Sequence, residues 1–240
     1  MNAIIAFSLL LCTAPANTEA RLAEVRRQYD TVAAKALVTE LRDALPEVAT
    51  PAEHLRFARS LILLAELHRI DFEQLSDETD RAARRDMAKE IDAAAREGIE
   101  HAEALGEVSE SYRLRCDFIA LMTRTKFQGK KNLKKIVKAS ERALALDPAN
   151  PHAYVSVAKP DLFKGGGDLQ KAHKLIEKAL ELDPSLETAK LLHAIALEKL
   201  GEKDRAEAAW KKILADNPHC AAARETMEKA GKTWEDVDGS

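Results

Sequence analysis

The chain has 240 residues, which is enough for one large domain or two and for a sizeable buried core. Aromatic residues make up only 5% of it while Ala, Leu, Glu and Lys are abundant, which favours helices over β-sheet. The formal charge of −3 is close to balanced, so charge alone gives no general attraction for nucleic acid or for an anionic membrane surface.

Residues 1–16 have the pattern of a secretory signal peptide. An apolar stretch of about ten residues, too short to span a bilayer, precedes an A-x-A cleavage site at Ala14-Pro15-Ala16. No Lys or Arg stands before the apolar stretch, so a buried N-terminal helix is the alternative. Cys12 raises a lipoprotein alternative, but Leu11 precedes it where a small residue is expected. We expect a periplasmic or secreted protein with no stable membrane insertion after signal removal.

Two cysteines remain beyond this segment, Cys116 within one predicted helix and Cys220 at the start of another. In an oxidising compartment they could form a disulfide, and the sequence does not decide whether they do. A free cysteine is commonly a small buried apolar group, so we expect both to be buried and unpaired.

The first part of the chain predicts two helices separated by a proline. From Thr18 to Leu45, apolar residues recur at helical spacing and stop before Pro46, which predicts one amphipathic helix. Thr50-Pro51-Ala52-Glu53 is a capping-box pattern, which predicts a second helix from there to about Ile70. The middle of that helix, residues 61–65, is apolar on every side, so we expect it to have neighbours on more than one face.

Two further helices are predicted before residue 130. A long Ala-, Arg- and Glu-rich segment runs from Asp77 to Leu105 and stops at Gly106. The next segment runs from Ser109 to Phe127 and stops before a turn at Gly129. No Gly/Ser-rich or Pro-rich linker interrupts the chain after residue 16, so we expect no domain boundary there.

A repeated motif organises the rest of the chain. Residues 132–148 align without a gap with residues 168–184, from the capping residue to a closing Asp-Pro, and contain RALALDP and KALELDP respectively. Further on, Ala206, Trp210 and Ile213 repeat the same pattern ahead of Asn217-Pro218. Two helices in a period of about 34 residues, with a small residue early in the second helix and a closing Pro, make up the tetratricopeptide signature.

The segment from Asn132 to Ala230 therefore resembles the tetratricopeptide repeat family. The resemblance implies an all-α fold, an α-α superhelix in which antiparallel helix pairs form a right-handed solenoid. It implies regular repeats and a terminal helix over residues 131–230, and degenerate, longer hairpins over residues 17–130. Residues 231–240 are expected to form a polar tail.

The corner before the second copy departs from the family pattern. Pro160 removes an amide donor and clashes with the preceding turn, so we expect it to break the helix that starts near Pro151 and to leave residues 159–167 partly unwound. Gly165-Gly166-Gly167 precedes a helix and is interpreted as a turn, with an anion-binding loop as the alternative.

This corner, together with the KAHKLIEKALELDP that follows, also resembles exported repeat proteins related to the T-component of TRAP transporters. A more distant similarity is to the regulator of microtubule dynamics family. The resemblance implies a periplasmic transporter accessory that binds a solute-binding protein, with a pore or pocket for a small apolar ligand.

No motif for catalysis, for a cofactor or for a metal was recognised. The sequence has no P-loop, no G-x-G-x-x-G after a strand and no G-x-S-x-G elbow. Its histidines show no H-E-x-x-H and no zinc spacing, and the adjacent His219-Cys220 lacks a second ligand pair. The abundant carboxylates are interpreted as solvated helix faces. We therefore expect a protein that is not an enzyme and that has no cofactor and no metal.

The predicted binding surface is the groove of the superhelix, which is lined by the first helix of each pair. The residues expected there are Val155, Lys159, Leu191, Ile195 and Glu198. The alternative is that Leu191 and Ile195 pack against the adjacent repeat. The expected occupant is a protein or peptide partner, and the oligomeric state is left open.

A basic cluster surrounds Gly129 and is a second candidate surface. It is either a patch for an acidic partner or a solvated helix start, and without interleaved aromatic residues it is a poor nucleic-acid site. Its members are Arg124, Lys126, Lys130, Lys131, Lys134, Lys135 and Lys138.

Overall fold

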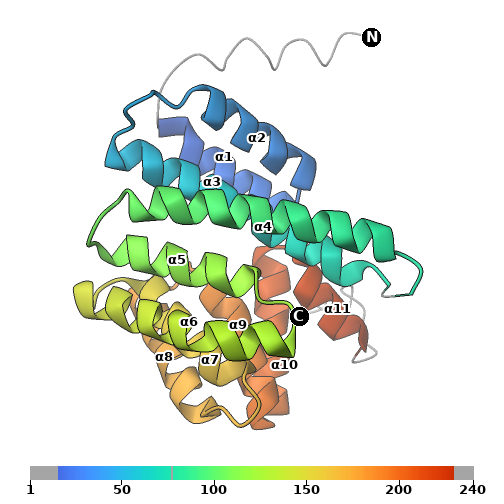
Figure 1. Cartoon of the computed structure of the whole chain (residues 1–240). Coiled ribbons are helices and arrows are strands. Elements are labelled where there is room, and N and C mark those ends of the chain that lie inside the picture. Colours follow the sequence, from blue (N-terminus) through green and yellow to red (C-terminus); the bar gives the residue numbers. More distant parts are fainter. Residues whose placement is uncertain (1–15, 77, 230–240) are drawn as a thin grey trace.

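The computed structural model describes residues 16–76 and 78–229, and within them the chain consists of helices joined by turns, with no strand (Figure 1). The signal-peptide prediction, apart from its last residue, and the predicted polar tail fall outside the described residues. In chain order the helices are α1 (Ala16–Gln28), α2 (Thr31–Asp43), α3 (Pro51–Gln74), α4 (Arg81–Glu103), α5 (Ser109–Leu121), α6 (Lys126–Leu146), α7 (Pro151–Phe163), α8 (Leu169–Leu182), α9 (Glu187–Leu200), α10 (Lys203–Asp216) and α11 (Ala221–Lys229).

Helices that follow one another in the chain pack as hairpins, α3 with α4, α5 with α6, α7 with α8 and α9 with α10, and α4 also packs extensively on α5. The first helices of successive pairs also touch, α3 with α5, α5 with α7 and α7 with α9, and α1 packs on α3. Figure 1 shows the blue, cyan and green helices in chain order from the top to the middle and the yellow and orange hairpins below them. The predicted all-α, α-α superhelical fold is confirmed.

The apolar faces form one large core and two smaller ones. The large core joins α1 to α5, with Phe57, Leu61 and Phe118 among its buried side chains. The smaller cores lie between the later hairpins, one around Ile176 and the other around Trp210. Each hairpin therefore buries its apolar stripe against its neighbours, as a stacked repeat must.

The predicted single helix from Thr18 to Leu45 is wrong, because the chain breaks it into α1 and α2. Tyr29 lies in the left-handed region with φ 54°, and Asp30 then caps α2 by accepting a hydrogen bond from the amide of Ala33 at 2.8 Å. An Asp side chain competes well for free amides at a helix start, which makes this break locally favourable.

The capping box that starts α3 is confirmed. The Glu53 amide donates to Thr50 Oγ1 at 3.3 Å, and the Thr50 amide donates to Glu53 Oε2 at 2.7 Å. The helix continues past Ile70 to Gln74, and residues 61–65 are all buried, as their all-round apolarity predicts.

Two predicted boundaries in the middle of the chain are shifted. Helix α4 starts at Arg81, and its turn at Gly106 has the left-handed φ of 75° that glycine favours. Helix α6 starts at Lys126, so Gly129 lies inside a helix and the predicted turn there is wrong. The reason is a second capping box, in which Thr125 and Gln128 satisfy each other's amides.

Pro160 does not break its helix. Helix α7 runs through it to Phe163, and the buried Ala158 and Leu162 hold the turns on both sides of it in the core. The corner is a short turn in which a Cβ on Gly167 would lie 2.0 Å from the carbonyl oxygen of Asp161, so only glycine fits there. The turn interpretation of the three glycines matches this geometry.

Residues near the two ends of the described chain meet. The Tyr29 hydroxyl, at the end of α1, donates a hydrogen bond to Cys220 Sγ at 3.5 Å, just before α11.

Cys116 and Cys220 are both buried free thiols, as expected, and burial raises the pKa of Cys116 to about 12. Among the described helices, none has the combination of length and apolarity that crossing a membrane requires.

Candidate functional site

A pocket of about 660 Å³ lies between α1 and the first helices of the hairpins. We call it the central pocket. Its walls are residues of α1, α3, α5 and α7 together with the turn after α8 and the start of α9. Since α3, α5 and α7 are the helices that line the groove in an α-α superhelix, the pocket lies where such a protein receives its partner.

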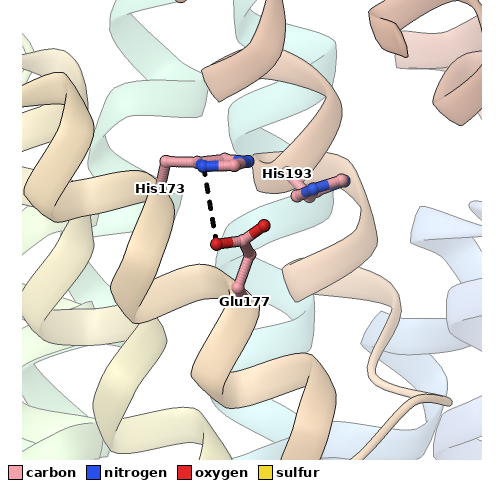
Figure 2. A group of neighbouring side chains, drawn as sticks. All are labelled: His173, Glu177 and His193. Atoms are coloured by element: carbon pink, nitrogen blue, oxygen red, sulfur yellow. Dashed lines mark ion pairs between the residues drawn. The ribbon is translucent and has the colours of Figure 1, made fainter.

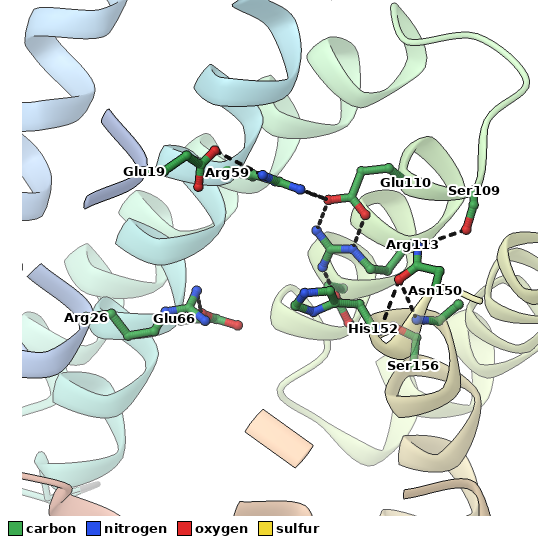
Figure 3. A network of polar contacts seen from close by, with 12 residues as sticks. Glu19, Arg26, Arg59, Glu66, Ser109, Glu110, Arg113, Asn150, His152 and Ser156 are labelled. Atoms are coloured by element: carbon green, nitrogen blue, oxygen red, sulfur yellow. Dashed lines mark hydrogen bonds and ion pairs between the residues drawn. The ribbon is translucent and has the colours of Figure 1, made fainter. Parts of the chain in front are cut away.

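One wall of the central pocket is a chain of ion pairs between helices (Figure 3). Arg59 of α3 reaches Glu19 of α1 through Nη1 (2.9 Å to Oε1) and Glu110 of α5 through Nη2 (3.2 Å to Oε1). Glu110 also accepts two hydrogen bonds from Arg113, from Nε to Oε2 and from Nη2 to Oε1, each at 2.7 Å. The planar guanidinium suits this two-point contact, which fixes both side chains.

The chain of ion pairs continues into the protein and joins the two halves of the array. Arg113 Nη1 lies 2.9 Å from Asp117 Oδ2, and Lys159 Nζ of α7 lies 2.8 Å from Asp117 Oδ1. Arg113 and Asp117 are each only 7% exposed. Removing either charge would leave its buried partner with one ion pair in place of two, so we expect these residues to act as one unit.

The electrostatics of the pocket keep the carboxylates ionised. Burial alone would raise the pKa of Glu110, but the charge and hydrogen bonds of Arg113, with help from Arg59, outweigh it and hold this pKa at about 2. The pKa of Asp117 is also lowered, because Lys159 and Arg113 outweigh burial. The pKa of His152 is lowered as well, to about 4, by burial and by the nearby charge of Arg113. For a histidine this means that the ring is neutral at pH 7.

The local sequence positions these groups. Asn150 caps α7 by accepting from the amides of His152 (3.0 Å) and Ala153 (3.4 Å), and its Nδ2 donates to Ser109 Oγ at 3.0 Å at the start of α5. This contact ties the beginnings of α5 and α7 together. The inward faces that carry Arg113 and His152 are thereby held in register.

The opposite wall belongs to α1, where Arg26 Nη2 lies 3.1 Å from Glu66 Oε2 of α3 (Figure 3). Nearer the solvent, Arg27 and Glu24 form an exposed pair at 2.8 Å. The pocket is thus lined by both signs of charge. It can present several donors and acceptors to a polar segment, and this charged lining does not match the apolar pocket that the transporter-accessory resemblance implies.

The structure separates the predicted groove residues. Val155 and Lys159 both line the central pocket. Leu191 and Ile195 instead pack against the core around Trp210, and Leu191 borders a hollow of only about 30 Å³ beside Tyr29 and Cys220.

Glu198, the fifth predicted groove residue, is also outside the central pocket. It is exposed and accepts a hydrogen bond from Trp210 Nε1 at 3.0 Å. The role of the five residues in binding stays a prediction, and only Val155 and Lys159 share the central pocket.

The basic cluster lies along α6. Lys130, Lys131 and Lys134 are exposed there, and the side chain of Lys126 falls outside the described part. Arg124 points away to an ion pair with Asp92 at 2.7 Å. Whether this surface receives an acidic partner stays a prediction.

Sequence reasoning missed two groups that the fold assembles. Glu110, Arg113 and Asp117 looked like ordinary surface charges of a helix, and their only local signal is their spacing of three and four residues, which places them on one helix face. The second group is His173 and Glu177 on α8 with His193 on α9, whose ligand atoms all lie within 4.8 Å of one another.

The geometry defines a class of protein, a helical-repeat protein with a pocket on the inner face of the array. The family model for the tetratricopeptide repeat matches residues 165–230, so this part of the chain is similar to tetratricopeptide repeats. Such repeats are typically non-catalytic scaffolds for protein–protein interaction. No curated protein matches the chain.

Proposed function

We propose that this protein is a non-enzymatic scaffold that binds a segment of a partner polypeptide in the central pocket. The observation that carries the proposal is the pocket itself, which opens on the helices that line the groove in a tetratricopeptide array. Its volume of about 660 Å³ is that of an ordinary ligand site, large enough for a few residues of an extended segment.

The charges of the central pocket suggest the chemistry of that segment. Its innermost charges, Arg113, Asp117 and Lys159, are paired with one another. Nearer the solvent, Glu19 and Glu24 are about half exposed and Glu187 is exposed, so carboxylates dominate the rim beside Arg27. A segment with a basic residue among polar ones complements this rim.

A blocking substitution tests the proposal. Ala23 is exposed on α1 and lines the pocket, so Ala23→Trp should fill the mouth without disturbing the core. The matched control is Ala82→Trp, at an exposed alanine of α4 outside the lining of the pocket.

We expect a partner purified with the wild-type chain to be retained by Ala82→Trp and lost by Ala23→Trp. Circular dichroism should show equal helicity for all three proteins. Retention of the partner by folded Ala23→Trp would remove the central pocket as the binding site.

Export of the protein is part of the same proposal. It is supported by the apolar stretch of residues 1–16 and its A-x-A site. The test is cell fractionation followed by N-terminal sequencing. A mature chain that begins after Ala16 in the exported fraction supports it, and an intact N-terminus in the cytoplasm contradicts it.

The second candidate is a transporter accessory that binds a solute-binding protein and a small ligand. It is favoured by the size of the central pocket, which is also that of a small-molecule site. The charged lining fits a polar or zwitterionic solute better than an apolar one. Isothermal titration with both kinds of solute separates the candidates, since a polypeptide scaffold should bind neither.

A further inference from the structure

Two histidines and a glutamate meet between α8 and α9, away from the central pocket (Figure 2). His173 and Glu177 are four residues apart on α8 and therefore share one face of that helix. His193 comes from α9, and its ring stacks on that of His173 with the centroids 5.0 Å apart. One ligand atom from each of the three residues lies within 4.8 Å of the others.

One ring nitrogen of His173 is buried without a hydrogen-bond partner. His173 is only 6% exposed, and its Nε2 is buried without a hydrogen bond. Its Nδ1 faces Glu177 Oε2 at 3.7 Å, which is too long for a hydrogen bond (Figure 2). A buried imidazole nitrogen without a partner is costly, and a metal ion is one of the few groups that can satisfy it.

The distances fit a small tetrahedral ion after a modest adjustment. Zinc–nitrogen and zinc–oxygen bonds of about 2.0–2.1 Å place tetrahedral ligands about 3.4 Å apart. The present spacing must therefore contract by about an ångström. Glu177 is 44% exposed and His193 is only half-buried, so both have freedom to rotate towards His173.

We propose that His173, Glu177 and His193 form a binding site for a divalent transition-metal ion, with Zn²⁺ as the preferred occupant. Imidazole favours zinc among the abundant divalent ions over calcium and magnesium, which prefer oxygen ligands. Three protein ligands leave the fourth position to water or to a group from a partner. The ion would bridge the second helix of one repeat and the first helix of the next.

The wild-type protein, produced without a histidine tag, is titrated with Co²⁺ as a spectroscopic probe and with Zn²⁺ by calorimetry. We expect one equivalent, a visible cobalt spectrum of tetrahedral type and a higher Tm in the presence of Zn²⁺. X-ray absorption of the zinc complex should count two imidazole ligands. No binding, or fewer than two imidazoles, overturns the proposal without any variant.

Variants then locate the site. Loss of even an outer partner of a metal ligand weakens binding about 10- to 100-fold, so His193→Gln and Glu177→Gln should each weaken Zn²⁺ at least about tenfold. The matched control is Glu181→Gln, one turn further along α8, where the exposed carboxylate pairs with Lys178.

A second histidine pair serves as an internal control. His54 Nδ1 and His101 Nδ1 lie 2.7 Å apart between α3 and α4. His54→Gln should leave Zn²⁺ affinity unchanged. Unaltered affinity in folded His193→Gln, or loss of binding in His54→Gln alone, places the ion elsewhere and overturns the proposal.

Discussion

The two halves of the array are built differently. Helices α3 and α4 have 24 and 23 residues, whereas α7 to α10 have 13 or 14 each. In the second half, local signals recur: side-chain caps start α7 and α8, and an Asp-Pro or Asn-Pro follows α8 and α10. In the first half, ion pairs between distant helices matter more, such as Arg42 with Glu97 at 2.7 Å. The comparison teaches that regularity and charge networks are alternative ways of fixing helix register.

The largest effect is expected at the junction between the halves, the buried network of Arg113, Asp117 and Lys159. Asp117→Ala would leave the Lys159 ammonium without its ion-pair partner and Arg113 with Glu110 alone, and we expect a loss of about 3–5 kcal/mol in the free energy of unfolding. Urea denaturation followed by circular dichroism measures it. Glu103→Ala removes an exposed partner of Arg115 and should cost at most about 1 kcal/mol. Equal effects of the two substitutions would show that the buried network is not special.

Acid should weaken the junction. His152 has a folded pKa of about 4 against 6.5 for a free histidine, so the unfolded chain binds more protons and the free energy of unfolding falls as pH drops from 6.5 to 4. Glu110, with a folded pKa of about 2 against 4.5, extends the loss from pH 4.5 to 2. Each of these two losses in the free energy of unfolding is on the order of 3 kcal/mol.

The acid effect can be assigned to one residue. His152→Gln should flatten the stability curve between pH 6.5 and 4 relative to wild type and leave the lower window unchanged. The lowered pKa values of His68, His101 and His193 act in the same sense and remain in both proteins. Parallel curves for wild type and His152→Gln would contradict this assignment.

The close approach of α4 and α5 distinguishes the first half from the second. A Cβ on Gly98 would lie 2.0 Å from Phe118 Cζ, so Gly98→Ala should overpack the core and cost about 1–3 kcal/mol in thermal or urea unfolding. Adding Phe118→Leu removes the ring atoms at fault and should recover part of this loss. A double variant less stable than Gly98→Ala would mean that the contact is not the cause.

The smallest expected effects are those of removing the N-cap of one helix in each half of the array. Asp168→Ala removes the cap of α8, and Thr50→Ala removes half of the capping box of α3. Each should lower the free energy of unfolding by about 1 kcal/mol, since both caps satisfy amides at a helix start. Urea titration measures both. A much larger loss at either site would point to a role beyond capping.

The second half could be predicted from the sequence because its signals are local. The helix α8, its cap at Asp168 and the turn at Gly201 follow from residues close in the chain. The break at Tyr29 and the continuation through Pro160 did not follow. At Tyr29 the local cap from Asp30 prevails over the continuous apolar pattern, and at Pro160 the burial of Ala158 and Leu162 prevails over the tendency of proline to end a helix.

The candidate sites were less predictable than the fold. Arg59 and Glu110 lie far apart in the chain, and nothing local marks them as partners. The same holds for His193 relative to His173 and Glu177, which spacing alone did not bring together. Val155 and Lys159 were placed in the groove because they follow the repeat register, and the structure puts both at the central pocket.

The contact between Tyr29 and Cys220 should change the order in which the helices unfold locally. An open row of repeats frays from its terminal units, because each end has only one neighbour. Here Tyr29 of the N-terminal hairpin contacts Cys220, just before the C-terminal helix, so each end of the array has a second neighbour. Hydrogen exchange should therefore show the first and last helices protected together, and losing that hydroxyl–thiol contact should let both exchange sooner.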